Sequence, residues 1–170
     1  MNKMSNVPLT CLIILTMACL SLLASSCQRE DEFELLRSHA DEVLQTMTPT
    51  KSVTDVKMII DDPVEAEKYT IVSARSAEDY GKGHVPGAIN IPWKTIADDA
   101  SLAQIPADKP VITYCYTGHT GQVTAVILSM LGYTATNMKY GMMGWTDDPE
   151  VLNTTPFDCN PPNYDTEDTP

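Results

Sequence analysis

Short apolar runs, separated by polar, Gly- and Pro-containing stretches, mark the central part of the chain. Runs of this kind are typical of the buried strands of a parallel sheet. The pattern predicts strands over residues 69–73, 88–91, 110–114 and 133–138. A further extended piece is expected to begin at Val53.

Segments with helical periodicity lie before and between these strands. Over residues 34–47 the apolar positions recur at helical spacing, which predicts an amphipathic helix ahead of the sheet. A short helix carrying Val56 and Ile59 is expected after a Thr54 cap, and a helical turn over 76–80 after a Ser76 cap. The remaining helices are predicted over 96–102, over 121–131 with Gly132 at its end, and as a turn or short helix over 141–145.

The alternation of strands and helices sets the fold class. Such an order predicts an α/β domain with a central parallel sheet and helices on both faces. We place this single domain at residues 50–150, and 43% hydrophobic residues are enough to build its core. Residues 151–170 are rich in Thr, Asn, Pro and Asp, which predicts a poorly ordered acidic, Pro-rich tail.

The first residues have the composition of an export signal. Lys3 precedes an uncharged apolar stretch over 7–24, which is long enough that an uncleaved membrane helix is an alternative. The sequence Leu-Ala-Ser-Ser-Cys at 23–27 resembles a bacterial lipoprotein signal, and a rival cleavage site at Cys19 leaves a shorter apolar region.

The lipoprotein resemblance implies that residues 1–26 are removed and that the thiol of Cys27 is acylated. Residues 27–49 then form a lipidated tether and the N-terminal helix. Several acyl chains give durable attachment to a membrane. We therefore expect a bacterial cell-envelope protein, lipid-anchored on the periplasmic face or at the cell surface.

The charge of the chain limits its partners. The 170 residues carry a formal net charge of −12, and no cluster of Lys or Arg occurs. Such a surface repels phosphate backbones, so we expect no nucleic-acid partner. The acidity is explained by solubility, and we expect a monomer.

The candidate chemistry lies where the strand over 110–114 ends. Cys115 follows that strand, and a helix is expected a few residues later. Ligands bind at the C-terminal ends of parallel strands, and loop N–H groups with a helix start stabilise an anion there. Cys115 is therefore expected to be a thiolate nucleophile, although many free cysteines are inert core residues. The substrate-binding loop would consist of Tyr116, Thr117, Gly118, His119, Thr120 and Gly121.

Four motifs in this order resemble the rhodanese domain. Residues 71–80 are similar to its Asp-x-Arg segment with an acidic-aromatic pair, and 83–92 to its Gly-His-Ile-Pro-Gly-Ala segment. Residues 115–120 resemble its six-residue active-site loop. Gly132-Tyr133 and residues 140–145 resemble its helix end and its terminal Gly-Gly-x-x-x-Trp.

The resemblance implies a sulfurtransferase that works through a Cys115 persulfide held by loop N–H groups, without a metal or organic cofactor. The donor would be a small sulfur compound or a protein persulfide. His84 would order its turn, and Trp145 would pack beside the loop. Arg75 would support the site or bridge to Glu78 or Asp79.

Two departures keep other functions open. Ser73 stands where the family has Asp, and the loop has no Lys or Arg, with Thr120 at a position that is often basic and His119 as its only potential cation. Fast turnover of dianionic thiosulfate is therefore not expected. A binding or redox-sensing module without turnover is the main alternative, and a phosphatase lacks its clamping Arg.

The remaining thiol leaves a redox question. Cys159 lies in the predicted tail and could pair with Cys115 in an oxidising compartment, or it could be incidental. No Cys-x-x-Cys motif supports a disulfide exchanger.

Overall fold

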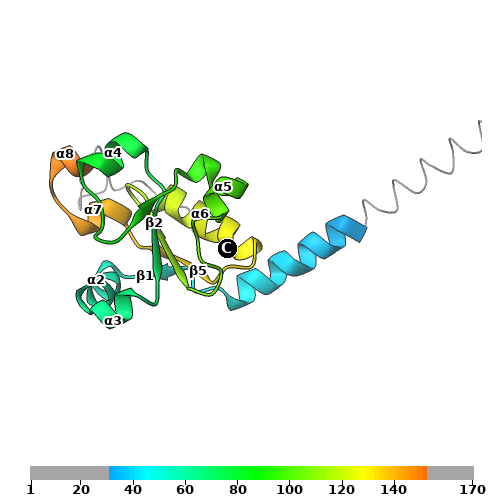
Figure 1. The fold of residues 1–170 in the computed structure, drawn as a ribbon. Coiled ribbons are helices and arrows are strands. Elements are labelled where there is room, and N and C mark those ends of the chain that lie inside the picture. Colours follow the sequence, from blue (N-terminus) through cyan, green and yellow to red (C-terminus); the bar gives the residue numbers. More distant parts are fainter. Residues whose placement is uncertain (1–30, 153–170) are drawn as a thin grey trace, which may run out of the picture. The chain divides into compact units, whose positions relative to one another are not determined.

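The computed structural model describes residues 31–152 as two separate units, one ending at Gln45 and the other beginning at Thr46 (Figure 1). Each unit is described by itself. The predicted signal, the lipidation site Cys27, residues 153–170 of the predicted tail and Cys159 lie outside the described residues. The first two residues of the predicted tail, 151–152, are instead helical, and Leu152 is buried in the core.

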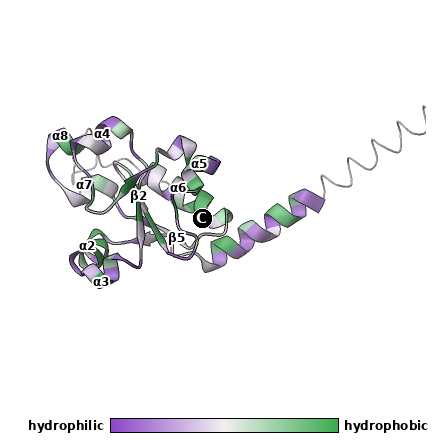
Figure 2. Cartoon of the chain, in the orientation of Figure 1, coloured by the Kyte–Doolittle hydropathy of each residue, from purple (hydrophilic) through white to green (hydrophobic). Residues whose placement is uncertain are grey.

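The first unit is a helix that spans residues 31–46, close to the predicted range. Its hydrophilic and hydrophobic residues alternate along its length in Figure 2, and Arg37 pairs with Glu34 at 2.8 Å. Apolar side chains that remain exposed on it are Phe33, Leu35, Leu36 and Leu44. Within residues 31–152, none of the helices has the length and apolar character required to cross a membrane.

The second unit is built on a five-stranded parallel sheet in the order β1-β5-β4-β2-β3. The predicted parallel α/β fold is therefore confirmed, with β4 at the centre of the sheet. Each strand is short, and most of the residues in the three central strands are buried because helices cover both faces. The strands are β1 (Thr50–Lys51), β2 (Thr70–Ser73), β3 (Ile89–Asn90), β4 (Val111–Tyr114) and β5 (Ala135–Met138).

Helices on the two faces of the sheet bury two separate hydrophobic clusters. Alternate side chains of β4 enter opposite clusters: Ile112 and Tyr114 join one, and Val111 joins the other. In Figure 1, α5 and α6 lie on one side of the sheet, and α2, α3, α7 and α8 lie on the other. The helices are α2 (Val53–Asp61), α3 (Pro63–Ala66), α4 (Ala77–Lys82), the 3-10 turn η1 (Trp93–Thr95), α5 (Asp99–Leu102), α6 (His119–Met130), α7 (Gly141–Trp145) and α8 (Pro149–Leu152).

The structure corrects the predicted start of α2. Its cap is Ser52 rather than Thr54, because the Ser52 hydroxyl accepts from the Asp55 N–H while the Asp55 carboxylate accepts from the Ser52 N–H. The extended piece accordingly precedes Val53, as β1. The hydrogen bonds to Ser52 lower the pKa of Asp55, as expected for a carboxylate in a capping box.

Two further helix boundaries differ from the prediction. The helix predicted over 96–102 is shorter than expected, because only Asp99–Leu102 is helical, as α5, with Asp98 at its N-cap. The 3-10 turn η1 precedes the predicted range, and buried Ile96 directly follows it. The helix predicted over 121–131 begins two residues earlier, directly after Gly118. The predicted Ser76 cap of α4 is confirmed, and Gly132 follows α6 at a φ of 90°.

A buried phenol ties β4 to the segment before β3. The Val85 N–H donates to Tyr114 Oη at 3.1 Å, and burial raises the pKa of Tyr114, so the phenol stays neutral. We expect Tyr114→Phe to lower the free energy of unfolding by about 1–3 kcal/mol, because it leaves a buried N–H without its acceptor. Urea denaturation measures this, with half-buried Tyr133→Phe as the control. Equal effects of the two substitutions would contradict the expectation.

Candidate active site

Cys115 lies at the C-terminal end of the central strand β4, and its residue surface is 1% exposed. The Gly118 N–H donates to Cys115 Sγ at 3.2 Å. Gly118 adopts a left-handed φ of 94° and caps α6, which turns its N–H back toward the sulfur. The sulfur therefore faces an N–H donor at the start of a twelve-residue helix.

The start of α7 is hydrogen-bonded to the main chain of the Cys115 loop. The N–H of Met142 donates to the Cys115 carbonyl, and the N–H of Met143 donates to the Tyr116 carbonyl, both at 2.9 Å. Gly141 has a φ of 54°, and a Cβ there would lie under 3.0 Å from the Cys115 carbonyl oxygen. Because glycine has no Cβ, α7 can approach the main chain of Cys115 closely at Gly141.

Tyr140 precedes this glycine in an uncommon conformation. It is the one non-glycine residue of the described chain with positive φ, at 66°, and it stands where the rhodanese motif has its first Gly. Non-glycine residues in this region carry about 1 kcal/mol or more of strain and occur often at functional sites. The turn at Tyr140, directly before α7, is therefore held in this conformation by the residues around it.

A second support for the loop comes from β5. Asn137 is 2% exposed, and its Nδ2 donates to the Gly118 carbonyl at 3.2 Å. A Cβ on Gly121 would collide with Asn137 Oδ1, so the first turn of α6 packs directly on this amide. The sequence analysis missed Asn137, although a polar residue inside a buried strand was its available signal.

Tyr116, the residue after Cys115, is hydrogen-bonded to α4. Its Oη donates to Asp79 Oδ2 at 2.5 Å, and the Asp79 residue is only 5% exposed. Lys82 Nζ lies 2.8 Å from Asp79 Oδ1, and the hydrogen bond to Asp79 is the largest cause of the raised pKa of Lys82. Sequence analysis placed Asp79 in the acidic-aromatic pair of the motif and gave it no role at the loop.

Arg75 is completely buried next to this pair. Its guanidinium donates to the main-chain carbonyls of Asp79 and Gly83, and its Cζ lies 5.3 Å from the centroid of the Tyr116 ring. The predicted bridge to the Asp79 carboxylate is thus replaced by a hydrogen bond to the Asp79 carbonyl. Nη1 and Nη2 of Arg75 thus have protein acceptors, whereas its buried Nε has no hydrogen-bond partner among the described residues. The guanidinium also lies near an aromatic ring.

The rest of the loop is polar and carries no Lys or Arg. Thr117 Oγ1 lies 2.6 Å from Nδ1 of the exposed His119. Thr120 lies in the first turn of α6, where its carbonyl accepts from the Thr124 hydroxyl. His119 and Thr120 therefore line the start of the helix.

The two remaining predicted support residues lie in packing positions. The His84 ring stacks on Tyr80 with centroids 3.9 Å apart, and its Nδ1 lies 3.0 Å from the Tyr80 carbonyl oxygen. Trp145 is half-buried against the cluster that contains Tyr114. His84 therefore packs within its own turn, and Trp145 packs against the core.

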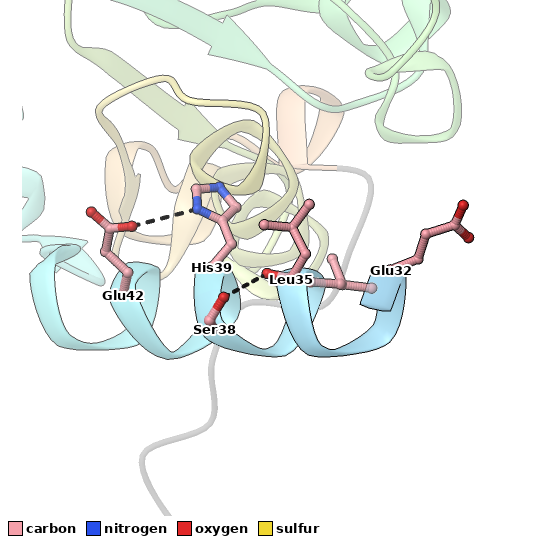
Figure 3. Close-up of a pocket in the computed structure, with 6 residues that line it drawn as sticks. Glu32, Leu35, Ser38, His39 and Glu42 are labelled. Carbon is pink, nitrogen blue, oxygen red and sulfur yellow. Dashed lines mark hydrogen bonds and ion pairs between the residues drawn. The ribbon is translucent and has the colours of Figure 1, made fainter. Parts of the chain in front are cut away.

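A pocket also occurs on the N-terminal helix, in the first unit (Figure 3). His39 Nδ1 lies 3.7 Å from Glu42 Oε2, and the Ser38 hydroxyl donates to the Leu35 carbonyl at 2.9 Å. Both contacts lie within the helix itself, and no thiol lines this pocket. Across residues 31–152 no three His, Cys, Asp or Glu side chains group closely enough to hold a metal ion.

Comparison with known proteins places the Cys115 loop in a wider group. Residues 56–148, more than half of the chain, match the Rhodanese-like domain family. Putative thiosulfate sulfurtransferase 2 of Mycobacterium bovis is 30% identical over 122 residues, which cover 62% of this chain and 37% of that protein. Thiosulfate sulfurtransferase of Azotobacter vinelandii is 29% identical over 108 residues, which cover 51% of this chain and 40% of that protein. The chain spans less than half of the length of these relatives.

Solved structures agree with the sequence match. A rhodanese-like domain protein from Staphylococcus aureus superposes with a TM-score of 0.52 at 25% identity, covering 59% of this chain and 94% of that protein. The BH2092 protein of Bacillus halodurans gives a TM-score of 0.53 at 25% identity, covering 62% and 76% of the two chains. The parallel sheet places Cys115 between the end of β4 and the start of α6, and the family match covers most of the second unit. This chain therefore belongs to the rhodanese-like domain family.

Proposed function

We propose that the protein is a sulfurtransferase or persulfide carrier that transfers sulfane sulfur through Cys115. The observation that carries the proposal is the 3.2 Å contact between the Gly118 N–H and Cys115 Sγ, at the C-terminal end of the central strand. A donor in this position stabilises negative charge on sulfur, in the thiolate and in a persulfide alike. The thiosulfate sulfurtransferases among its relatives support the same chemistry.

The reaction has two displacement steps and needs no external oxidant. In the first, the Cys115 thiolate attacks the outer sulfur of the donor, the donor bond to that sulfur breaks, and its electron pair leaves with the remainder of the donor. In the second, a nucleophilic acceptor attacks the outer sulfur of the persulfide. The sulfur–sulfur bond then breaks, and the electron pair returns to Cys115.

The surroundings of Cys115 favour a slim donor that does not rely on a cation. The cysteine is 1% exposed, so only a narrow reacting end, such as a terminal sulfur, reaches it without displacing the loop. No Lys or Arg lies in residues 115–121, and the fully buried Arg75 uses Nη1 and Nη2 to donate to protein carbonyls. We therefore infer that a small persulfide, a polysulfide or a protein persulfide is a better donor than thiosulfate.

A donor screen on the described domain, read by intact mass, tests this function. We expect persulfide donors to add the mass of one sulfur atom to the protein and cyanide to remove it as thiocyanate. We also expect thiosulfate to load the protein more slowly than the persulfide donors. Absence of an adduct with every donor class would reject the sulfurtransferase proposal.

A binding or sensing module without turnover is the second candidate. The almost complete burial of Cys115 and the replacement of the family's Asp by Ser73 favour it. In that case a persulfide on Cys115 is not passed on, so a loaded protein would fail to convert excess acceptor over repeated cycles. Multiple turnovers with any donor and acceptor pair would exclude this candidate.

We also propose that the domain is tethered to the cell envelope through lipid on Cys27. The apolar stretch over 7–24 and the small residues before Cys27 support the proposal. Metabolic labelling with a radioactive fatty acid in a bacterial host is expected to mark the full chain and not its Cys27→Ser variant. Equal labelling of the two chains would refute lipidation at this residue.

A further inference from the structure

We infer that Tyr116 and Asp79 form a positioning pair that holds the Cys115 loop in its reactive arrangement. Tyr116 directly follows the nucleophile, and its Oη donates to Asp79 Oδ2 at 2.5 Å. Hydrogen bonds to an ionised acceptor are short and about twice as strong as neutral ones. The inference rests on the proposed function for its catalytic consequence, but not for the geometry.

Asp79 is a fixed anchor rather than a mobile surface carboxylate. Its residue is 5% exposed, and its Oδ2 also accepts from the Ser76 hydroxyl at 2.8 Å. The Asp79 N–H donates back to the Ser76 hydroxyl at 3.1 Å, and Lys82 Nζ lies 2.8 Å from Oδ1. The carboxylate is therefore part of the first turn of α4, and Tyr116 is joined to that turn.

The ring of Tyr116 is held on its face as well as at its hydroxyl. Arg75 Cζ lies 5.3 Å from the ring centroid, and the Arg75 residue is fully buried. A buried guanidinium attracts the electron-rich face of a phenol. Moving the ring away would both break the hydrogen bond to Asp79 and uncover this cation, so two interactions resist the same displacement.

The pair of Tyr116 and Asp79 acts on the sulfur through the backbone of residues 116–118. The carbonyls of Cys115 and Tyr116 are fixed from one side by the N–H groups of α7. The Tyr116 side chain fixes the same segment from α4, and the turn then leads to the Gly118 N–H that contacts Sγ. Without the hydrogen bond between Tyr116 and Asp79, the loop that carries the Gly118 N–H is held less firmly. The sulfur then loses part of its stabilisation as an anion.

Alkylation of Cys115 by iodoacetamide tests the pair without any sulfur donor. Tyr116→Phe keeps the ring over Arg75 and removes only the hydroxyl. We expect its alkylation rate at pH 7 to fall by about tenfold, an effect of the size expected for the loss of one charge-assisted hydrogen bond. In sulfur transfer, kcat is expected to fall more than KM changes, because the hydroxyl that is removed binds Asp79 and acts on the sulfur through the loop backbone.

A double-mutant cycle with Asp79→Asn identifies the pair as the cause. Asp79→Asn replaces the charged acceptor of the Tyr116 hydroxyl by a neutral one, so both substitutions act on the hydrogen bond between Tyr116 and Asp79. We therefore expect their effects on the alkylation rate to be less than additive. Tyr133→Phe is the matched control and is expected to alkylate at the wild-type rate. Thermal unfolding of each variant checks that the fold is retained.

Two results would overturn the inference: wild-type alkylation kinetics in Tyr116→Phe, or additive effects of the two substitutions. Failure of the proposed function looks different. In that case the wild-type protein transfers no sulfur with any donor, while the alkylation rates of the variants still follow the expected order.

Discussion

Cys115→Ser is expected to abolish sulfur loading and to reduce sulfur transfer by at least about a thousandfold, as removal of a covalent nucleophile does in other enzymes. A serine hydroxyl is not ionised at neutral pH, so it cannot attack the donor sulfur at a useful rate. The Gly118 N–H can still donate to the oxygen that replaces Sγ, and the neighbouring packing hardly changes. Intact mass after donor treatment and thiocyanate formation from cyanide measure the two effects.

The fold of this variant is expected to remain. Cys115 contributes its carbonyl to the Met142 N–H, and this contact does not depend on the side chain. The free energy of unfolding should therefore change by no more than about 1 kcal/mol. A large loss of stability would remove the meaning of the activity measurement, so denaturation is measured alongside it.

Cys159→Ser is the matched control, because it removes a thiol that follows the family match. We expect this variant to load and transfer sulfur at the wild-type rate under reducing conditions. Two outcomes contradict the assignment of Cys115 as the carrier. One is retention of more than a tenth of the transfer in Cys115→Ser, and the other is loss of transfer in Cys159→Ser.

The position of the loop was predictable because its signals are local. Apolar runs specify β2 and β4, and the cysteine directly after β4 places a thiol at the edge where parallel strands end. Gly118 supplied the second signal, since a glycine between a strand and a helix permits the left-handed turn found there. The position of the Cys115 loop was thus readable from a dozen consecutive residues.

The supports of the loop were not predictable in the same way, because they depend on contacts between distant segments. Tyr116 meets Asp79 across 37 positions of sequence, and Asn137 meets Gly118 across 19. A single sequence gives no register for such pairs. Strand β1 was expected to begin at Val53 but lies at Thr50–Lys51, and its position was misjudged for the same reason. Its two residues are defined by pairing with β5, where Thr50 lies opposite Asn137.

The cap of α2 is a different kind of error, because the sequence did contain the answer. Both Ser52 and Thr54 are suitable capping residues, but only Ser52 has an acidic residue three positions later, at Asp55. The reciprocal pair of hydrogen bonds then decides between the two candidates. Local signals of this type correct boundaries by one or two residues without changing the fold.

Gly141→Ala is expected to lower the free energy of unfolding by about 3 kcal/mol or more, a loss typical of a forced collision in a packed interior. The new Cβ would lie under 3.0 Å from the Cys115 carbonyl oxygen and 3.0 Å from the Cys115 carbonyl carbon and the Gly118 nitrogen. These neighbours are backbone atoms, which cannot rotate away as a side chain does. To relieve the contact, α7 must withdraw from the loop, and the hydrogen bond from Met142 to the Cys115 carbonyl is weakened.

Gly132→Ala separates this collision from the cost of the backbone conformation. Gly132 also has a positive φ, at 90°, but a Cβ there meets nothing within 4 Å. We expect this control to lose only about 1–2 kcal/mol, the cost of holding an alanine in a left-handed conformation. Urea denaturation and the rate of Cys115 alkylation are measured for both variants, and only Gly141→Ala should slow alkylation, because only Gly141 contacts the loop. Equal losses in the two variants, with unchanged alkylation in both, would show that the close approach of α7 does not hold the nucleophile in place.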